Sequence, residues 1–338
     1  MVEIEQLKLQ LGERIYNPTV REVFEEYIEY GCLDHYKQII DGMPDAVAQT
    51  VIKVQSTQVY KEKSLWPIFI SEKLGLDTSK AAKIGAVIDL LWGVAIMIDD
   101  IFDGDKMRGD SPAAWVNIGA KKTQEFAYIA VESVFDYLSR EVDSKSVKLL
   151  KEFMIRGINS VVLHRRMNID TDYSIILNNY LNRDDFHSAF PLYALYDPKV
   201  ISLQDLEGMS LGIRIFNQAG QLINDTRDVL PGAKDGTSRL SDFREGQVTV
   251  ALKCLYSNLT DADKKFFSNA FGTKTIDYYT IRRIGAMAGS GNFRDQMRRR
   301  INDTYARGFS VLCMYMSEKG IKMLEEWIRY KTGILGDL

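Results

Sequence analysis

The sequence predicts an all-α protein, and three observations support this fold class. The chain has only seven prolines in 338 residues, so few positions would interrupt a helix. Leu, Ile, Met, Lys and Glu are in steady supply, which favours helices over strands. No stretch shows the apolar-polar alternation of a strand, and no internal repeat or linker is evident. We therefore expect one helical domain over residues 1–338.

Composition and charge narrow the class of protein. Hydrophobic residues make up 46% of the chain, which is ample for a buried core. The net charge of −3 and the pI near 5.8 argue against a nucleic-acid surface. The three cysteines are scattered without metal-ligand spacing, so we expect them to be reduced and the protein to be cytoplasmic.

No targeting or membrane-spanning segment is expected either. The first residues show no signal-peptide pattern. The most apolar run, from Ile84 to Ile98, is interrupted by Asp89 and is too short to span a bilayer. We expect a soluble protein.

The first helices are predicted from breaks and start signals. Residues 1–56 suggest two or three amphipathic helices, with breaks near Asn17-Pro18 and Gly42-Met43-Pro44. The next helix ends near Gly75, and Ser79 is the expected N-cap of the helix after it. That helix leads into a cluster of aspartates, and a turn follows at Gly109-Asp110-Ser111-Pro112.

The rest of the chain continues as helices. The helical patterns that follow cover about 122–141, 143–163, 170–195 and 202–230. A polar loop, Pro231 to Ser241, precedes a helix that opens at Asp242. The last 75 residues predict three or four more helices.

The aspartate cluster is the first sign of chemistry. Asp99, Asp100 and Asp103 follow an apolar helical run, where the pattern predicts a buried face. Asp99 and Asp103 are four residues apart, so they share one side of a helix. Unpaired anions are costly in apolar surroundings, and hard oxygen ligands completed by substrate phosphates are typical of Mg²⁺. The cluster suggests a metal-diphosphate site.

A second polar cluster ends the apolar helical run that begins at Met209. Asn224 and Asp228 repeat the spacing of four residues, and Asp225 stands beside them. About 125 residues separate the clusters, enough chain to bring two helices face to face. Several Mg²⁺ ions between them would neutralise a departing diphosphate, so that a C–O bond to an allylic carbon can ionise.

These motifs resemble those of the trans-isoprenyl diphosphate synthases, within the class I terpenoid synthase fold. Asp99-Asp100-Ile101-Phe102-Asp103 matches the motif DDxxD, with Arg108 at the usual distance. Gln221 to Asp228 matches QxxDDxxD, with Asn224 in place of the first Asp. Ser241 to Thr249 matches the stretch that usually reads DxxEGKxT. The resemblance covers about Lys61 to Lys331 and implies a helical bundle around a central cavity.

The resemblance also implies roles for individual residues. Asp99 and Asp103 would be the principal metal ligands on one wall of the cavity, with Asp100 and Asp225 as supporting catalytic residues. Asn224 and Asp228 would bind metal on the other wall, and the family implies three Mg²⁺ ions. Arg108 would bind the substrate diphosphate, and Gln221 would face the reacting centre. A homodimer is also implied.

The chain departs from the family where a second substrate, isopentenyl diphosphate, is bound. Lys63 survives from the pattern GGKxxR, but Trp66 replaces its Arg. Trp92 stands where a Gln or His precedes the first Asp by seven residues. Other cations are also lost: Gly109 replaces an Arg of the RRG turn, Gln247 replaces the Lys of EGKxT, and His187 stands at the place of the Lys of KTA. Trp66 and Trp92 would form an aromatic wall, suited to an apolar or flat acceptor or to stabilising carbocations.

The leading hypothesis is a prenyltransferase that ionises an allylic diphosphate and transfers the prenyl cation to another small-molecule acceptor. A terpene synthase or cyclase is the first alternative, because an Asn at the position of Asn224 is typical of terpene cyclases. An ordinary chain-elongating synthase and an inactive regulatory subunit are the others. The small Val94 and Ala95, five and four residues before the first Asp, leave room for a C15 or C20 chain.

Overall fold

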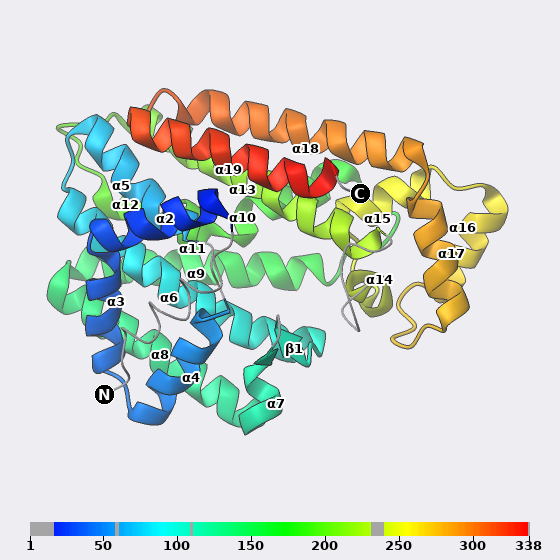
Figure 1. The fold of residues 1–338 in the computed structure, drawn as a ribbon, viewed down its shortest axis with the longest axis horizontal. Coiled ribbons are helices and arrows are strands. Elements are labelled where there is room, and N and C mark those ends of the chain that lie inside the picture. Colours follow the sequence, from blue (N-terminus) through cyan, green and yellow to red (C-terminus); the bar gives the residue numbers. More distant parts are fainter. Residues whose placement is uncertain (1–16, 58–60, 109–110, 231–239, 337–338) are drawn as a thin grey trace. The chain divides into compact units, whose positions relative to one another are not determined.

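The structure, a computed structural model, describes residues 17–57, 61–108, 111–230 and 240–336. Over these ranges the chain is helical apart from one pair of two-residue strands, as the sequence predicts (Figure 1). In chain order the elements are α2 (Pro18–Glu29), α3 (Cys32–Asp41), α4 (Asp45–Gln55), α5 (Glu62–Leu74), α6 (Thr78–Asp103), β1 (Met107–Arg108), β2 (Ser111–Pro112), α7 (Ala114–Ile118), α8 (Ala120–Glu141), α9 (Ser144–His164), α10 (Tyr173–Arg183), α11 (Asp185–Ser188), α12 (Phe190–Leu195), α13 (Leu203–Val229), α14 (Ser241–Glu245), α15 (Val250–Ser257), α16 (Asp261–Ala270), α17 (Tyr278–Ala288), α18 (Gly291–Leu312) and α19 (Glu318–Gly336).

The chain forms two compact units. The first takes the described residues up to Phe153 together with Phe186–Met209 and Cys313–Trp327. The second takes Met154–Asp185, Ser210–Leu312 and the described residues from Ile328 onward. The expectation of a single domain over residues 1–338 stays a prediction.

Helix α6 is the core of the first unit. It packs against α3, α4, α5 and α8 (Figure 1), so it is apolar on almost every side. The helix has 26 residues, longer than the run that the sequence suggested, and by length and composition it would reach across a membrane. However, 78% of its most apolar stretch is buried, as in the core helix of a soluble protein.

The ends of α5 and α6 follow from local sequence. Gly75 ends α5 with φ +70°, a left-handed conformation that favours glycine, as predicted. Asp77 rather than Ser79 caps α6, because its side chain accepts a hydrogen bond from the Lys80 N–H at 2.9 Å. Gly104, with φ +68°, ends α6 directly after Asp103. The first acidic cluster is therefore the last turn of α6.

Three predicted features differ in the structure. The pattern at 170–195 is three helices, α10 to α12, and not one. Asp184 leaves helical geometry after α10, and Pro191 lies in the first turn of α12, where an N–H has no partner within the helix. At the predicted turn, Met107–Arg108 pairs antiparallel with Ser111–Pro112, while residues 109–110 and residues 231–239 of the polar loop lie outside the described ranges. Helix α14 begins at Ser241, one residue before the predicted start.

In the second unit, α15 packs against α10 and α18, and α13 crosses α18 closely. Gly308 makes this crossing possible, because a Cβ there would lie 2.8 Å from the Phe216 nitrogen. A buried histidine, His164, ends α9 in the same unit and lies 5.7 Å from the Tyr180 ring.

His164 makes the stability of the fold depend on pH. Burial, aided by the nearby Arg183, lowers the pKa of His164 from 6.5 to about 4. Between these values the unfolded chain binds a proton that the folded chain does not, so stability falls as the pH falls. We expect wild type to lose about 2 kcal/mol more than His164→Gln between pH 7 and pH 5, measured by urea unfolding. Identical pH dependence in both proteins would contradict the assignment.

Candidate active site

The first acidic cluster lies at the C-terminal end of α6, in the first unit. Asp99 and Asp103 are half-buried and one helical turn apart, so they share one face, as the spacing predicts. Asp100 is buried, with 1% of its surface exposed, and points to another side of the helix. Asp99 and Asp103 are thus partly exposed on one face of α6, whereas the Asp100 carboxylate is buried.

Asp100 is held by Arg108 of β1. Arg108 Nη2 donates a hydrogen bond to Asp100 Oδ1, and Asp105 Oδ2 lies 4.0 Å from the same nitrogen. Burial raises the pKa of Asp100, although Arg108 works against this rise. Burial opposes the charge of Arg108, but the hydrogen bond to Asp100 and the charges of Asp100, Asp99 and Asp105 together outweigh it and raise the pKa of the guanidinium. Both side chains therefore stay paired and fixed in direction.

Arg108 keeps donors for a ligand. Its Nε is buried and has no hydrogen-bond partner among the described residues. A guanidinium has five N–H groups in a planar fork that matches the oxygens of a phosphate. The expected role of Arg108 in binding a diphosphate is compatible with its pairing to Asp100.

A cavity of about 210 Å³ opens beside the pair of Asp100 and Arg108. It is bounded by α4, α7 and the strand pair, and neither Asp99 nor Asp103 lines it. The lining residues are Gln49, Thr50, Lys53, Val54, Thr57, Asp100, Arg108, Ser111, Pro112, Ala113, Ala114, Asn117 and Ile118. Sequence reasoning did not anticipate this space, because no motif marks α4 or α7.

The second cluster lies at the end of α13, in the second unit. Asn224 is exposed, whereas Asp225 is buried with 1% of its surface exposed. Tyr180 donates a hydrogen bond to Asp225 Oδ2 at 2.6 Å, and Gln221 donates one to Oδ1 at 2.8 Å. Burial raises the pKa of Asp225 to about 6, although both donors pull it down. Gln221 thus binds Asp225 in this structure, and Tyr180 is a partner that no motif indicated.

Asp228 is also buried, and its carboxylate receives hydrogen bonds from the start of α14. The Ser241 hydroxyl donates to Oδ1 at 3.1 Å, and the Ser241 N–H lies 3.3 Å from the same atom. The Asp242 N–H lies 3.4 Å from Oδ2. Asp228 therefore joins α13 to the stretch Ser241 to Thr249, the third motif of the sequence. A carboxylate has about four lone-pair positions, so a metal ligand role for Asp228 stays a prediction.

Removing the Tyr180 hydroxyl tests the support of Asp225. We expect Tyr180→Phe to lower the free energy of unfolding by about 1.5–3 kcal/mol at pH 8, because a buried carboxylate loses a donor. Urea unfolding measures the change, with Tyr128→Phe as the control, since Tyr128 is 66% exposed. A loss below about 0.5 kcal/mol would show that Tyr180 does not support Asp225.

Two residues that depart from the family pattern, Trp92 and His187, meet the retained Lys63 in the first unit. Lys63 Nζ lies 3.4 Å from the centre of the Trp92 ring and 3.3 Å from His187 Nε2. Trp92 and His187 pack edge to face with their ring centres 5.2 Å apart. Phe186 adds a third ring, 6.5 Å from Trp92 and 4.9 Å from His187. Trp66 is 3% exposed and packs in the core. These contacts join residues up to 124 positions apart.

The donor set fits Mg²⁺ that is bound together with a substrate. Within residues 17–57, 61–108, 111–230 and 240–336, no group of three His, Cys, Asp or Glu side chains is placed to hold a metal ion alone. Mg²⁺ is usually bound by one or two carboxylates plus substrate phosphates, so such a group is not required. Asp99 and Asp103 offer two carboxylates on one face, which is the arrangement that this mode needs.

Comparisons with known proteins agree with the motifs. The family model described as polyprenyl synthetase matches residues 63–284. No curated protein sequence matched the chain. The fold is similar to a polyprenyl synthase from Caulobacter crescentus solved with calcium and isoprenyl diphosphate, with 17% identity, a TM-score of 0.76 and coverage of 93% of this chain and 96% of that one.

Two further solved structures are similar. A decaprenyl diphosphate synthase from Rhodobacter capsulatus has 12% identity and a TM-score of 0.79, covering 94% of this chain and 98% of its own. A geranylgeranyl pyrophosphate synthase from Lactobacillus brevis has 13% identity and a TM-score of 0.76, covering 96% and 99%. At 12–17% identity these solved structures establish the fold alone. The match at the level of sequence is the family model, which covers more than half of the chain.

Proposed function

Because the chain belongs to the polyprenyl synthetase family, whose members are enzymes that use allylic diphosphates, we propose the following activity. The protein ionises an allylic isoprenyl diphosphate and transfers the prenyl cation to a small-molecule acceptor other than isopentenyl diphosphate. The contact of Lys63 with Trp92 and His187 carries this proposal. Lys63 is the one cation kept from the GGKxxR pattern. Its ammonium contacts the Trp92 indole, where the family pattern has polar or basic residues that bind a second diphosphate.

The ionising half of the reaction depends on the acidic clusters. Asp99 and Asp103 would bind Mg²⁺ from α6, and Asn224 and Asp228 would bind it from α13, with three ions implied by the family resemblance. The bound Mg²⁺ supplies positive charge that stabilises the departing diphosphate. Arg108 binds diphosphate oxygens through its free donors, while Asp100 holds its guanidinium in place. Asp225 accepts a hydrogen bond from the Gln221 amide, which would hold Gln221 at the reacting centre that the resemblance implies for it.

The acceptor half depends on the aromatic cluster. Trp92 and Phe186 stack with their ring centres 6.5 Å apart, and such rings would stabilise a carbocation and fit an apolar or flat acceptor. Lys63 donates to His187 Nε2, since an ammonium can only donate, so His187 carries its proton on Nδ1. A neutral His187 beside Lys63 offers little positive charge to a second diphosphate.

The prenyl chain of the substrate is proposed to have 15 or 20 carbons. Ala95 is small and half-buried, four residues before Asp99 on the same helix. Val94, five residues before Asp99, is also small, and the buried Leu91 would close the space further along the helix. We also propose that the enzyme works in the cytoplasm as a homodimer, as the resemblance implies.

Two other functions have support of their own. A terpene synthase is favoured by Asn224, which is exposed at the place of the first Asp of QxxDDxxD. Ordinary chain elongation fits the named activities of the similar solved structures. An inactive subunit has less support, because acidic residues remain in both clusters.

Product analysis distinguishes these functions. The protein is incubated with Mg²⁺ and geranyl, farnesyl or geranylgeranyl diphosphate, with and without isopentenyl diphosphate and a panel of aromatic and amine acceptors. We expect diphosphate release and a prenylated acceptor by mass spectrometry. A volatile terpene without an acceptor would support a terpene synthase, and no turnover of any substrate would support an inactive subunit.

A further inference from the structure

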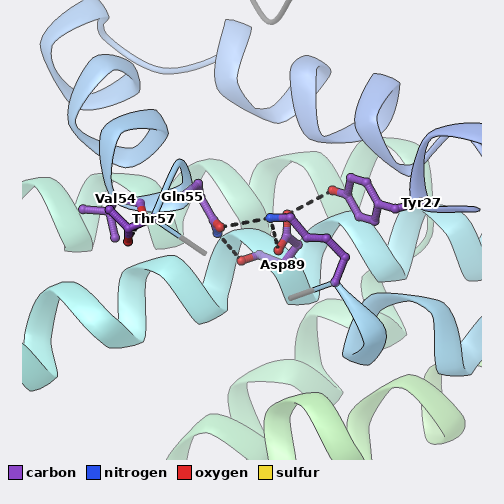
Figure 2. Close-up of polar contacts among 6 residues, drawn as sticks. Tyr27, Val54, Gln55, Thr57 and Asp89 are labelled. Carbon is purple, nitrogen blue, oxygen red and sulfur yellow. Dashed lines mark hydrogen bonds and ion pairs between the residues drawn. The ribbon is translucent and has the colours of Figure 1, made fainter. Parts of the chain in front are cut away.

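A buried ion pair joins α5 to the middle of α6. Lys61 Nζ lies 2.9 Å from both carboxylate oxygens of Asp89, and the two side chains are only 3% and 5% exposed (Figure 2). Lys61 is the residue directly before α5, and Asp89 interrupts the apolar run of α6. Neither residue belongs to a motif that the sequence analysis used for function.

Side chains from two other helices complete the network around this ion pair. Tyr27 of α2 donates to Asp89 Oδ2 at 3.1 Å, and burial followed by the charge of Asp89 raises the pKa of Tyr27. Gln55 of α4 accepts from Lys61 Nζ at 3.3 Å and donates to the Asp89 carbonyl oxygen (Figure 2). Gly93 leaves room for Gln55, because a Cβ there would collide with its side chain. The network therefore fixes one point of α6 from three sides.

The ion pair is a departure of this chain from the family pattern. In GGKxxR the two positions before the Lys are glycines, but here they are Lys61 and Glu62, and both side chains are buried. A buried ion pair loses its hydration, so an apolar pair of similar size would stabilise the core about as well. A role in positioning fits this exchange better than a gain in stability does.

The position of the ion pair points to what it holds. Lys63 follows Lys61 by two residues on α5, and Trp92 follows Asp89 by three residues on α6. The ion pair and the contact of Lys63 with Trp92 therefore join the same two helices within one turn of each other. We infer that Lys61 and Asp89 are positioning residues that hold the Lys63 ammonium on the Trp92 ring.

The positioning role of Lys61 and Asp89 does not depend on the proposed function, but its consequence for acceptor binding rests on that function. In the proposed site, Trp92 and His187 belong to the aromatic cluster that binds the acceptor, and the Lys63 ammonium contacts both. Loosening the ion pair would release Lys63 from the aromatic cluster and weaken the binding of a flat or apolar acceptor. The contact itself can be measured without any turnover.

The test is the coupling between Lys63 and Trp92 in two backgrounds. A double-mutant cycle of Lys63→Met and Trp92→Leu gives this coupling from urea unfolding. In wild type we expect a coupling of about fivefold in the unfolding equilibrium constant, as for a partly buried cation–π contact. In the background Lys61→Met with Asp89→Leu we expect less than twofold. Equal coupling in both backgrounds would overturn the inference.

Two further variants keep the test decisive. If the apolar background does not fold, Lys61→Gln with Asp89→Asn serves instead, since it keeps the size and some hydrogen bonds of the pair. The matched control is Lys80→Met with Asp143→Leu, which removes an ion pair of the first unit that is 27% and 38% exposed. This control should leave the coupling between Lys63 and Trp92 within twofold of wild type, and a loss in this control as large as in the Lys61 and Asp89 background would overturn the inference.

A kinetic readout links the ion pair to the acceptor. In the background without the ion pair we expect the KM for the acceptor to rise about tenfold, while the KM for the allylic diphosphate stays within threefold. Unchanged acceptor KM would refute the consequence for acceptor binding. If the wild-type enzyme instead adds isopentenyl diphosphate to the allylic substrate, the proposed function fails. The coupling between Lys63 and Trp92 still decides whether the ion pair holds Lys63.

Discussion

Replacing Asp99 with alanine is expected to lower kcat/KM for the allylic diphosphate by about 10³-fold or more. The proposed metal stabilises charge in the transition state by several kcal/mol, and Asp99 is one of two carboxylates on its face of α6. The free energy of unfolding should change by less than about 1 kcal/mol. A carboxylate in the last turn of a helix is unfavourable for the helix dipole, so its loss does not weaken α6.

Diphosphate release under steady-state conditions measures this change, and urea unfolding measures the stability. Asp136→Ala is the matched control, because Asp136 is exposed on α8 in the same unit and should leave both values unchanged. Activity of the Asp99 variant within tenfold of wild type would show that the first acidic cluster does not bind the catalytic metal.

The second large effect concerns the buried ion pair of Lys61 and Asp89. We expect Lys61→Met alone to lower the free energy of unfolding by about 3–5 kcal/mol, because the Asp89 carboxylate stays in the core without its cation. Asp89→Leu alone should cost a similar amount, because it leaves the Lys61 ammonium unpaired. The two changes together should lie within about 2 kcal/mol of wild type, since neither change then leaves an unpaired charge of this pair in the core.

Urea unfolding of the four proteins at pH 7 measures this cycle. The dependence of the free energy of unfolding on urea concentration should be the same in all four. If the double variant loses the sum of the two single losses, the residues are not coupled and the ion pair does not act as a unit.

The helices and their ends were largely predictable because the signals are local. The left-handed glycine at Gly75 and the spacing of Asp99 and Asp103 follow from neighbouring residues alone. The N-cap of α6 was wrong by two residues, because Asp77 and Ser79 are both good caps and only the side-chain geometry chooses between them. The split of 170–195 depends on Pro191 and the exit at Asp184, which a periodic pattern hides.

The partners of the buried charged side chains were not predictable in the same way. Tyr180 lies 45 residues from Asp225, and Lys61 lies 28 residues from Asp89. Such pairs are set by the packing of helices far apart in the chain, and no spacing rule reaches them. Trp92 and His187 were singled out by departure from a family pattern, and Lys63 as the cation kept from it. Their contact in the structure is new information.

The central claim is that this chain keeps the ionisation of an allylic diphosphate but does not use isopentenyl diphosphate as the acceptor. The most direct test is the ratio of isopentenyl carbon incorporated to diphosphate released, measured with labelled isopentenyl diphosphate, farnesyl diphosphate and Mg²⁺. We predict that diphosphate is released while almost no label enters a longer prenyl diphosphate. One isopentenyl unit incorporated for each diphosphate released would contradict the claim and identify a chain-elongating synthase.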